Sequence, residues 1–191
     1  LDAGEIDLAM VLLPADNPGL VCTTLLAEDL VLVLPRHHPL ARRDVLEIQD
    51  VRSEPFVLLT AEYGLRQRVV EECERAGFLP EIVFESREVG IIQGLVEAGL
   101  GITIIPESAV RHDLATVARP VLSGGRRPQR RIGLAHRADR YLTLAARQLF
   151  ALARDLFDPE ARGLAAARTT ANPSSAVPVE RARRGATGKR K

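Results

Sequence analysis

Short apolar runs alternate with amphipathic segments along most of the chain. Four of the runs have the length and composition of buried strands: 6–13, 31–35, 56–59 and 102–105. The segments 64–76 and 91–98 place their apolar residues at helical spacing, and each ends at a glycine suited to a left-handed stop, Gly77 or Gly99. The strand–helix alternation over 56–105 predicts an α/β fold with right-handed crossovers.

The stretch Gly94–Pro106 is the most informative part of this pattern. It combines the end of a helix, a tight turn around Gly101 and an apolar run, Ile102–Ile105, that is closed by proline. Such a run predicts a strand buried on both faces of a parallel sheet. Ligands bind at the carboxyl ends of strands in open α/β sheets, so this point favours a binding protein.

The two ends of the chain differ from the middle. Leu1–Gly4 resembles the last turn of a helix, so we expect the chain to begin inside a fold whose first elements are missing. After a possible strand at 116–121 come a short strand at 131–135 and a final helix at about 141–157. The composition of 158–191 buries too little apolar surface to offset the entropy of ordering, and predicts a disordered basic tail.

Charge is unevenly distributed over the 191 residues. The formal net charge is +1, but residues 159–191 contain eight Arg or Lys and two acidic residues, so the remainder is mildly acidic. A domain that grips DNA by itself is expected to show a basic face, and this one shows none in sequence. We favour a solvated extension over a DNA-binding role for the tail. No apolar run is long enough to span a membrane and the start lacks a signal peptide, which indicates a cytoplasmic protein.

The sequence contains no recognisable catalytic, metal or cofactor motif. Cys22 and Cys73 have no partners at metal-ligand spacing, and the adjacent pair His37 and His38 has no third ligand type to join it. Neither G-x-S-x-G nor a phosphate-binding glycine motif occurs. We therefore expect no enzyme activity, no metal and no cofactor.

The order of the segments resembles the effector-binding part of LysR-type transcriptional regulators. The segments that carry the resemblance, over about residues 1–157, are LDAGEIDLAMVLL, EDLVLVLPRHHPLARR, EPFVLL, RVVEECERAGFLPEIVFES, GLVEAGLGITIIP and RRIGLAHR with a terminal helix. The resemblance implies an α/β, two-lobed type 2 periplasmic-binding-protein-like fold with mixed, mostly parallel sheets, in which the first lobe is incomplete.

The same resemblance implies an organisation and partners. The first lobe would comprise 1–35 plus 131–157, and the second lobe 36–130, with crossings near Pro35–Pro39 and Gln129–Ile132. A small effector, an organic acid or aromatic metabolite, would lie between the lobes. DNA would be bound only by a winged helix-turn-helix absent from this chain, and the regulator would be a homodimer or homotetramer without a membrane anchor. A transporter's solute-binding protein, which would share the fold, is the alternative.

Seven residues are candidates for effector contact on this interpretation. Two predicted helix starts in the second lobe, after Thr60 and after Ser86, offer unpaired N–H groups to a carboxylate. The full set is Thr60, Tyr63, Ser86, Arg87, Pro14, Pro106 and Arg66. Simpler roles remain open for several of them. Thr60 and Ser86 could be helix caps, Tyr63 a loop aromatic, and the two arginines surface partners of Glu62 and Glu88.

Overall fold

The computed structural model describes residues 1–15 and 17–157, so the predicted basic tail 158–191 lies outside the described residues. The strands are β1 Ala9–Leu13, β2 Leu20–Pro35, β3 Leu46–Glu47, β4 Pro55–Leu59, β5 Glu81–Ser86, β6 Thr103–Pro106, β7 Thr116–Leu122 and β8 Gln129–Arg137. The helices are α1 Gly64–Arg75, α2 Val89–Glu97 and α3 Leu144–Phe157, with short 3-10 turns η1 Pro39–Arg42, η2 Ile48–Val51 and η3 Glu107–Ala109. Each strand and complete helix predicted from the sequence is present, most with ends shifted by a few residues. The predicted strand 31–35 is the end of the longer strand β2, and Leu1–Gly4 forms a turn that is not part of a helix.

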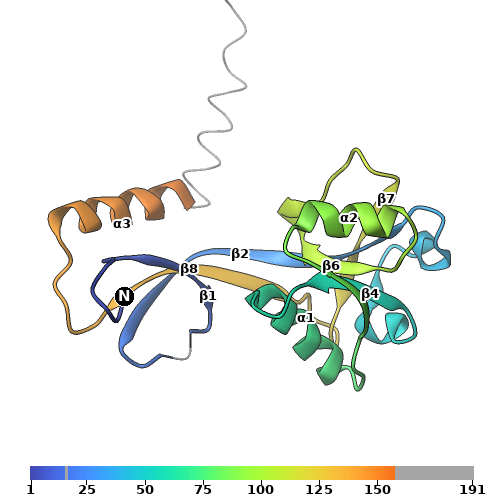
Figure 1. Ribbon diagram of the computed structural model, residues 1–191, viewed down its shortest axis with the longest axis horizontal. Coiled ribbons are helices and arrows are strands. Elements are labelled where there is room, and N and C mark those ends of the chain that lie inside the picture. The colour runs from blue at the N-terminus through green and yellow to red at the C-terminus, as the bar shows by residue number, and fades with distance from the viewer. Residues whose placement is uncertain (16, 158–191) are drawn as a thin grey trace, which may run out of the picture.

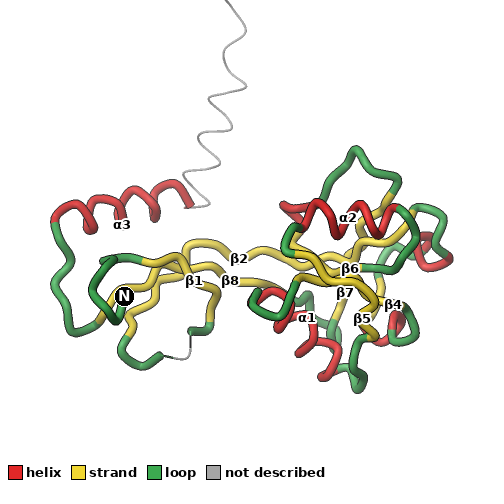
Figure 2. Tube along the Cα trace, in the orientation of Figure 1, coloured by secondary structure: helices red, strands yellow, loops and turns green. Residues whose placement is uncertain are grey.

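Two long strands join two separate lobes. In Figure 1, β1, the amino terminus and α3 lie at one end, and α1, α2 and the short strands lie at the other, with β2 and β8 running between them. Figure 2 shows this connection as a continuous ribbon of strand. The long strand β2 changes partners along its length, pairing with β8 over Leu20–Asp29 and with β6 and β7 over Leu30–Pro35.

The hydrophobic core belongs to the second lobe. Its buried residues run from Leu30 in β2 to Val121 in β7 and include both α1 and α2. Leu30–Leu34 of β2 are buried in this core, where β6 and β7 pair with the strand on its two edges, whereas the first part of β2 is mostly half-buried or exposed. This is why the run 31–35 is continuously apolar.

The α/β fold class is confirmed, with one correction to the strand directions. The sheets are mixed, but the pairs β1–β8, β2–β6, β2–β7 and β2–β8 are antiparallel, and only β3–β7 and β4–β5 are parallel. The expectation of mostly parallel pairing is therefore wrong for the described residues. The chain returns to its first lobe after building the second, so β8 must run back along β2 in the opposite direction.

Strand β6, which corresponds to the predicted strand Ile102–Ile105, agrees with the prediction in its burial but not in its strand direction. All four residues of β6 are buried, as predicted. Its parallel contact is limited to the bridge between Ile102 and Phe56, because its other edge pairs antiparallel with β2.

The first lobe buries less of its apolar surface than the sequence predicted. Strand β1 alternates in burial, and Met10 and Leu12 are 61% and 38% exposed. Of the apolar stripe predicted for the last helix only Ala146 is buried, while Leu149 and Leu156 remain exposed. The expectation that strand 6–13 is buried on both faces is therefore not met in the described structure.

The position of the first crossing follows from the change of partners in β2. The strand leaves β8 at Asp29 and joins the core of the second lobe at Leu30. The lobe limits remain a prediction, and this pairing favours a crossing near Asp29–Leu30 rather than Pro35–Pro39. The second crossing, at the start of β8, coincides with the predicted Gln129–Ile132.

One glycine is required by a close approach of two backbone segments. A Cβ on Gly101 would lie 2.5 Å from the carbonyl oxygen of Pro55, to which the neighbouring Ile102 N–H donates a hydrogen bond. The chain thus passes from α2 into β6 directly against β4. A side chain here would push apart the backbone segments that hold the second lobe's core.

We predict that Gly101→Ala destabilises the protein by about 1–3 kcal/mol, the usual cost of overpacking a core. Gly94→Ala is the matched control, because Gly94 lies inside α2 and its Cβ would meet nothing within 4 Å. That variant should stabilise the protein by about 0.5–1 kcal/mol through helix propensity. Urea unfolding of both variants checks this, and equal effects would contradict the assigned contact.

Candidate functional site

Two cavities lie where the lobes meet. The first, which we call the apolar cavity, has a volume of about 320 Å³. It is lined by Met10, Val11, Leu12, Leu59, Tyr63, Gly64, Leu65, Arg87, Val89, Pro106, Ala109, Arg130 and Ile132. Its walls come from both lobes, which is the arrangement expected of a ligand cleft.

The ends of two core strands position one wall of the apolar cavity. Leu59 ends β4 and Pro106 ends β6, and the chain continues from there into the loop before α1 and into η3. The facing wall comes from strands β1 and β8, which pair with each other so that Leu12 lies opposite Ile132. The cavity therefore lies at the carboxyl ends of β4 and β6, the kind of position at which ligands bind in open α/β sheets.

Arg87 and Arg130 are the charged residues among those that line the apolar cavity. Arg87 is 76% exposed and its Nε lies 3.1 Å from Glu62, in a surface pair that contributes little stability. The pKa of Glu62 lies below its ordinary value, first because of the residue's own backbone N–H and to a smaller extent because of Thr60 and Arg87. The Arg87 guanidinium is thus a solvent-exposed cation that borders the cavity.

Arg130 is held much more firmly. It lies opposite Glu28 in the β2–β8 ladder, and its Nε and Nη2 are 2.9 and 2.8 Å from Glu28 Oε2. The other carboxylate oxygen of Glu28 accepts a 2.6 Å hydrogen bond from the Ser108 hydroxyl of η3. This network ties both crossing strands to the second lobe beside the cavity.

The start of α1 adds backbone donors. Gly64 and Leu65 line the apolar cavity, and the N-cap residue Tyr63 makes no side-chain capping bond. The first N–H groups of an α-helix have no partner within the helix and carry partial positive charge. The arrangement therefore suits a small, largely apolar molecule that bears one anionic group.

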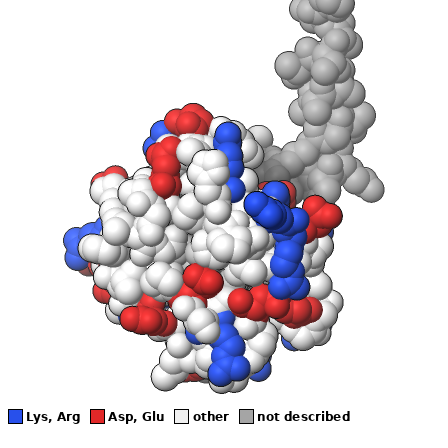
Figure 3. Space-filling model, turned by 90° about the vertical axis from the view of Figure 1, so that its right-hand side faces the viewer, with Lys and Arg blue, Asp and Glu red and all other residues white. Residues whose placement is uncertain are grey.

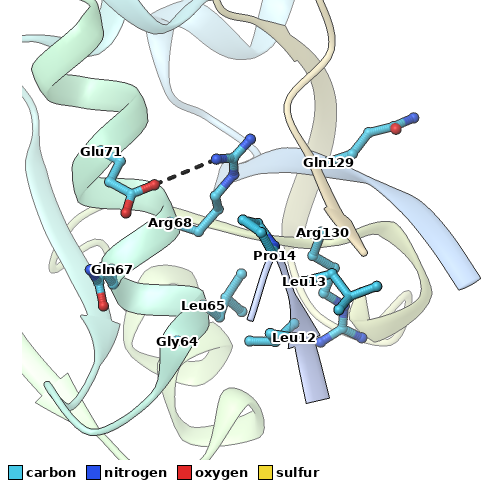
Figure 4. A pocket seen from close by; sticks show the side chains of 10 residues that line it. All are labelled: Leu12, Leu13, Pro14, Gly64, Leu65, Gln67, Arg68, Glu71, Gln129 and Arg130. Carbon is cyan, nitrogen blue, oxygen red and sulfur yellow. Dashed lines mark hydrogen bonds and ion pairs between the residues drawn. The ribbon is translucent and has the colours of Figure 1, made fainter. Parts of the chain in front are cut away.

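The second cavity, which we call the polar cavity, also measures about 320 Å³. Figure 4 shows its lining residues: Leu12, Leu13, Pro14, Gly64, Leu65, Gln67, Arg68, Glu71, Gln129 and Arg130. Arg68 extends from α1 past Pro14 and lies 3.4 Å from Glu71 and 3.0 Å from the buried Glu72. The amides of Gln67 and Gln129 and the ion pair of Arg68 with Glu71 make this cavity polar, in contrast to the apolar cavity.

Four of the seven predicted site residues line these cavities. Tyr63, Arg87 and Pro106 line the apolar cavity, and Pro14 lines the polar one. Arg66 instead borders a small space of about 10 Å³, and its Nη2 lies 2.6 Å from Glu85. The alternative of a surface pair between Arg87 and Glu62 is present, whereas Arg66 pairs with Glu85 and not with Glu62 or Glu88.

Thr60 and Ser86 line neither cavity. The hydroxyl oxygen of Thr60 is buried in the loop before α1, and α1 begins only after Tyr63. Ser86 accepts a 3.2 Å hydrogen bond from the N–H of Glu88, the residue immediately before α2. Neither residue is the N-cap of its helix, so the interpretation as simple caps needs correction. Their contact with an effector remains a prediction.

The sequence does not single out most of the cavity's apolar wall or Arg130 at its edge. Arg130 lay within a predicted crossing, but nothing in its local sequence distinguishes it from its many arginine neighbours. Met10 and Leu12 lie in the predicted buried strand 6–13, and Ile132 lies in the predicted short strand 131–135. The alternation of β1 was the available signal, because successive residues of a strand face opposite sides.

Comparison with known proteins places this architecture in a family. Residues 1–158 match the LysR substrate binding domain family, and the chain belongs to it. The HTH-type transcriptional regulator YwbI of Bacillus subtilis is 31% identical over 150 residues, an alignment covering 75% of this chain and 48% of that protein. The resemblance described from the sequence is thereby confirmed.

Two further proteins are similar to the chain. A probable hydrogen peroxide-inducible genes activator of Mycobacterium avium is 32% identical over 169 residues, covering 84% of this chain and 52% of that protein. The effector binding domain of QuiR, solved in complex with shikimate, superposes with a TM-score of 0.68 at 24% identity, covering 82% of this chain and 72% of that domain. The chain spans about half the length of the curated relatives it matches.

The two cysteines differ sharply in environment. Cys22 is exposed on β2, whereas Cys73 is completely buried in α1. Burial raises the pKa of the Cys73 thiol to about 12, with additional contributions from Glu72 and Glu74. A thiol with this pKa is protonated at neutral pH and is a poor nucleophile.

We predict that one thiol per chain reacts with an aromatic disulfide reagent at pH 8 and that the second reacts only after unfolding. The reason is that Cys73 is both inaccessible and protonated several pH units below its pKa. Absorbance of the released thiolate measures this. Cys22→Ser should abolish the fast reaction, and fast labelling in that variant would contradict the assigned burial.

Proposed function

We propose that this chain is the effector-sensing domain of a LysR-type transcriptional regulator and that the effector binds in the apolar cavity. The observation that carries the proposal is an interlobe cavity whose walls are apolar, with Arg87, Arg130 and the uncapped start of α1 at its edge. This combination provides burial for a hydrocarbon body and donors for one anionic group. Membership of the LysR substrate binding domain family supports the same assignment.

The effector class that fits is a compact organic acid, aromatic or alicyclic. A cavity of about 320 Å³ is at the lower end of the range for small-molecule sites. Micromolar to millimolar sensing requires about 4–8 kcal/mol, and a charge-assisted hydrogen bond contributes about 1.5–3 kcal/mol. One or two such bonds and an apolar wall are enough. The complex of the QuiR domain with shikimate, a small cyclic acid, supports this class by analogy of fold.

Peroxide sensing is the second function that the relatives suggest, since one of them is named a hydrogen peroxide-inducible genes activator. Oxidation of a thiol by peroxide requires an accessible thiolate. Cys73 is buried with a raised pKa, so the exposed Cys22 is the cysteine that peroxide could reach, and it lines neither cavity. The interlobe cavities therefore support ligand binding and offer no thiol for oxidation.

A transporter's solute-binding protein would share the fold, but the similar full-length proteins are transcriptional regulators. We infer that the complete protein acts in the cytoplasm and contacts DNA through a helix-turn-helix outside this chain. No helix in the described part of the chain is long and apolar enough to cross a membrane. Figure 3 shows both signs of charge interspersed on one face of the second lobe, unlike the basic surface of a DNA-binding domain.

Regulation would follow from a change in lobe arrangement. A ligand shifts such an equilibrium only by its differential affinity for the two forms. A ligand that contacts Leu12 on β1 and Tyr63 before α1 touches both lobes at once, and so favours one relative position. That position would in turn favour one arrangement of the subunits in a dimer or tetramer of the complete regulator. We assign the chain no enzymatic role.

The test is to fill the apolar cavity. In Ala109→Phe a ring enters the cavity from η3, and we expect loss of the thermal stabilisation that monocyclic carboxylates such as benzoate and cyclohexanecarboxylate give the wild-type chain. At a ligand concentration of 100 times Kd that stabilisation is about 2.7 kcal/mol. Thermal unfolding with and without ligand measures it.

Ala98→Phe is the matched control, because Ala98 is exposed at the end of α2 and lines neither cavity. It should retain the full response to ligand. An undiminished response in Ala109→Phe would show that the effector binds elsewhere.

A further inference from the structure

The apolar and polar cavities are adjacent and share four lining residues, Leu12, Gly64, Leu65 and Arg130. At their boundary the Leu12 side chain of β1 lies directly against the backbone of Gly64, the first residue of α1. A Cβ built on Gly64 would be 2.8 Å from Leu12 Cδ1. The boundary is therefore a direct contact between the first lobe and the second.

Position 64 requires a glycine because of the limited space there, and not because of its backbone conformation. Gly64 is not among the glycines with positive φ, so an L-residue could adopt its backbone conformation. Nothing larger than hydrogen fits between this backbone and Leu12 without displacement of the leucine. Figure 4 shows Leu12 and Leu65 at this boundary, with the Arg130 side chain beside them.

The contact separates two spaces of equal size and unlike chemistry. On one side lie Met10, Val89, Ala109 and Ile132, and on the other Gln67, Arg68, Glu71 and Gln129. Each space alone holds about 320 Å³. Together they would accommodate a ligand about twice as large.

We propose that the contact of Leu12 with Gly64 is a partition that determines the size of effector the domain accepts. With the partition in place, the apolar cavity admits a carboxylic acid with one ring and rejects one with two rings in line. This inference rests on the proposed function, since it assigns a specificity-determining residue to the same cavity.

Leu12 is suited to this role because the fold depends on it little. Its side chain is 38% exposed and lies outside the buried core, so truncation removes little buried surface. Its position on β1 is held by pairing with Ile132 in β8. Changes in ligand size preference can therefore be measured in a folded protein.

The experiment compares benzoate with biphenyl-4-carboxylate by isothermal titration calorimetry. We expect the wild-type chain to bind benzoate at least about tenfold more tightly, the usual discrimination of an apolar pocket against a ligand that does not fit. In Leu12→Ala the Kd for biphenyl-4-carboxylate should fall about tenfold or more relative to the Kd for benzoate.

Leu13→Ala is the matched control, because the neighbouring Leu13 lines only the polar cavity. It should leave the preference unchanged. Equal affinity of the wild type for both acids, no gain in Leu12→Ala, or an equal gain in Leu13→Ala would each overturn the partition. Failure of the wild type to bind either acid would instead contradict the proposed function itself, and the partition with it.

A second pair of variants tests the contact independently of ligand size. Gly64→Ala should weaken benzoate binding, because its Cβ displaces Leu12 into the apolar cavity, and Leu12→Ala combined with it should restore the affinity. Additive effects of the two substitutions on the benzoate Kd would show that the residues do not touch, and would overturn the proposal.

Discussion

The antiparallel pairing of β2 with β8 is the constraint on which the rest of the structure depends. Its ladder joins Leu20–Asp29 to Gln129–Arg137, and the same two strands connect the lobes. At the crossing, consecutive acidic residues of β2 bind basic and amide groups of the returning chain: Glu28 pairs with Arg130, and Asp29 with Arg127 and Gln129. The pKa of Asp29 is lowered, first by Gln129 and then by Arg127.

This pairing determines where a cleft can form. Because β2 ends inside the second core and β8 begins beside it, the carboxyl ends of β4 and β6 face the paired strands β1 and β8 across a short distance. The apolar cavity occupies that space. One wall combines Leu12 of β1 with its partner Ile132 of β8, and the facing wall comes from the second lobe, so a ligand bound between them contacts both lobes.

The local elements were predictable because their signals are local. The glycine stops at Gly77 and Gly99 adopt positive φ, and the buried run before Pro106 forms β6, as their sequences indicated. The family could also be named from the order of segments. The direction of strand pairing could not, because apolar runs look alike in parallel and antiparallel sheets and only the return of the chain along β2 decides between them.

The candidate site was less predictable than the helices and strands, because it depends on contacts between distant segments. Tyr63, Arg87 and Pro106 line the apolar cavity because they follow strand ends or precede helix starts, features that can be read along the chain. Thr60 and Ser86 shared those features, yet line neither cavity.

The sequence by itself determined the elements, their order and the family, since these depend on spacing and turn chemistry within a few residues. Only the tertiary structure decided that Leu12 lies against Gly64 and that Arg130 is anchored to Glu28 beside the cavity. These contacts join distant segments, and their geometry is set by strand register and chain return, which no local pattern encodes.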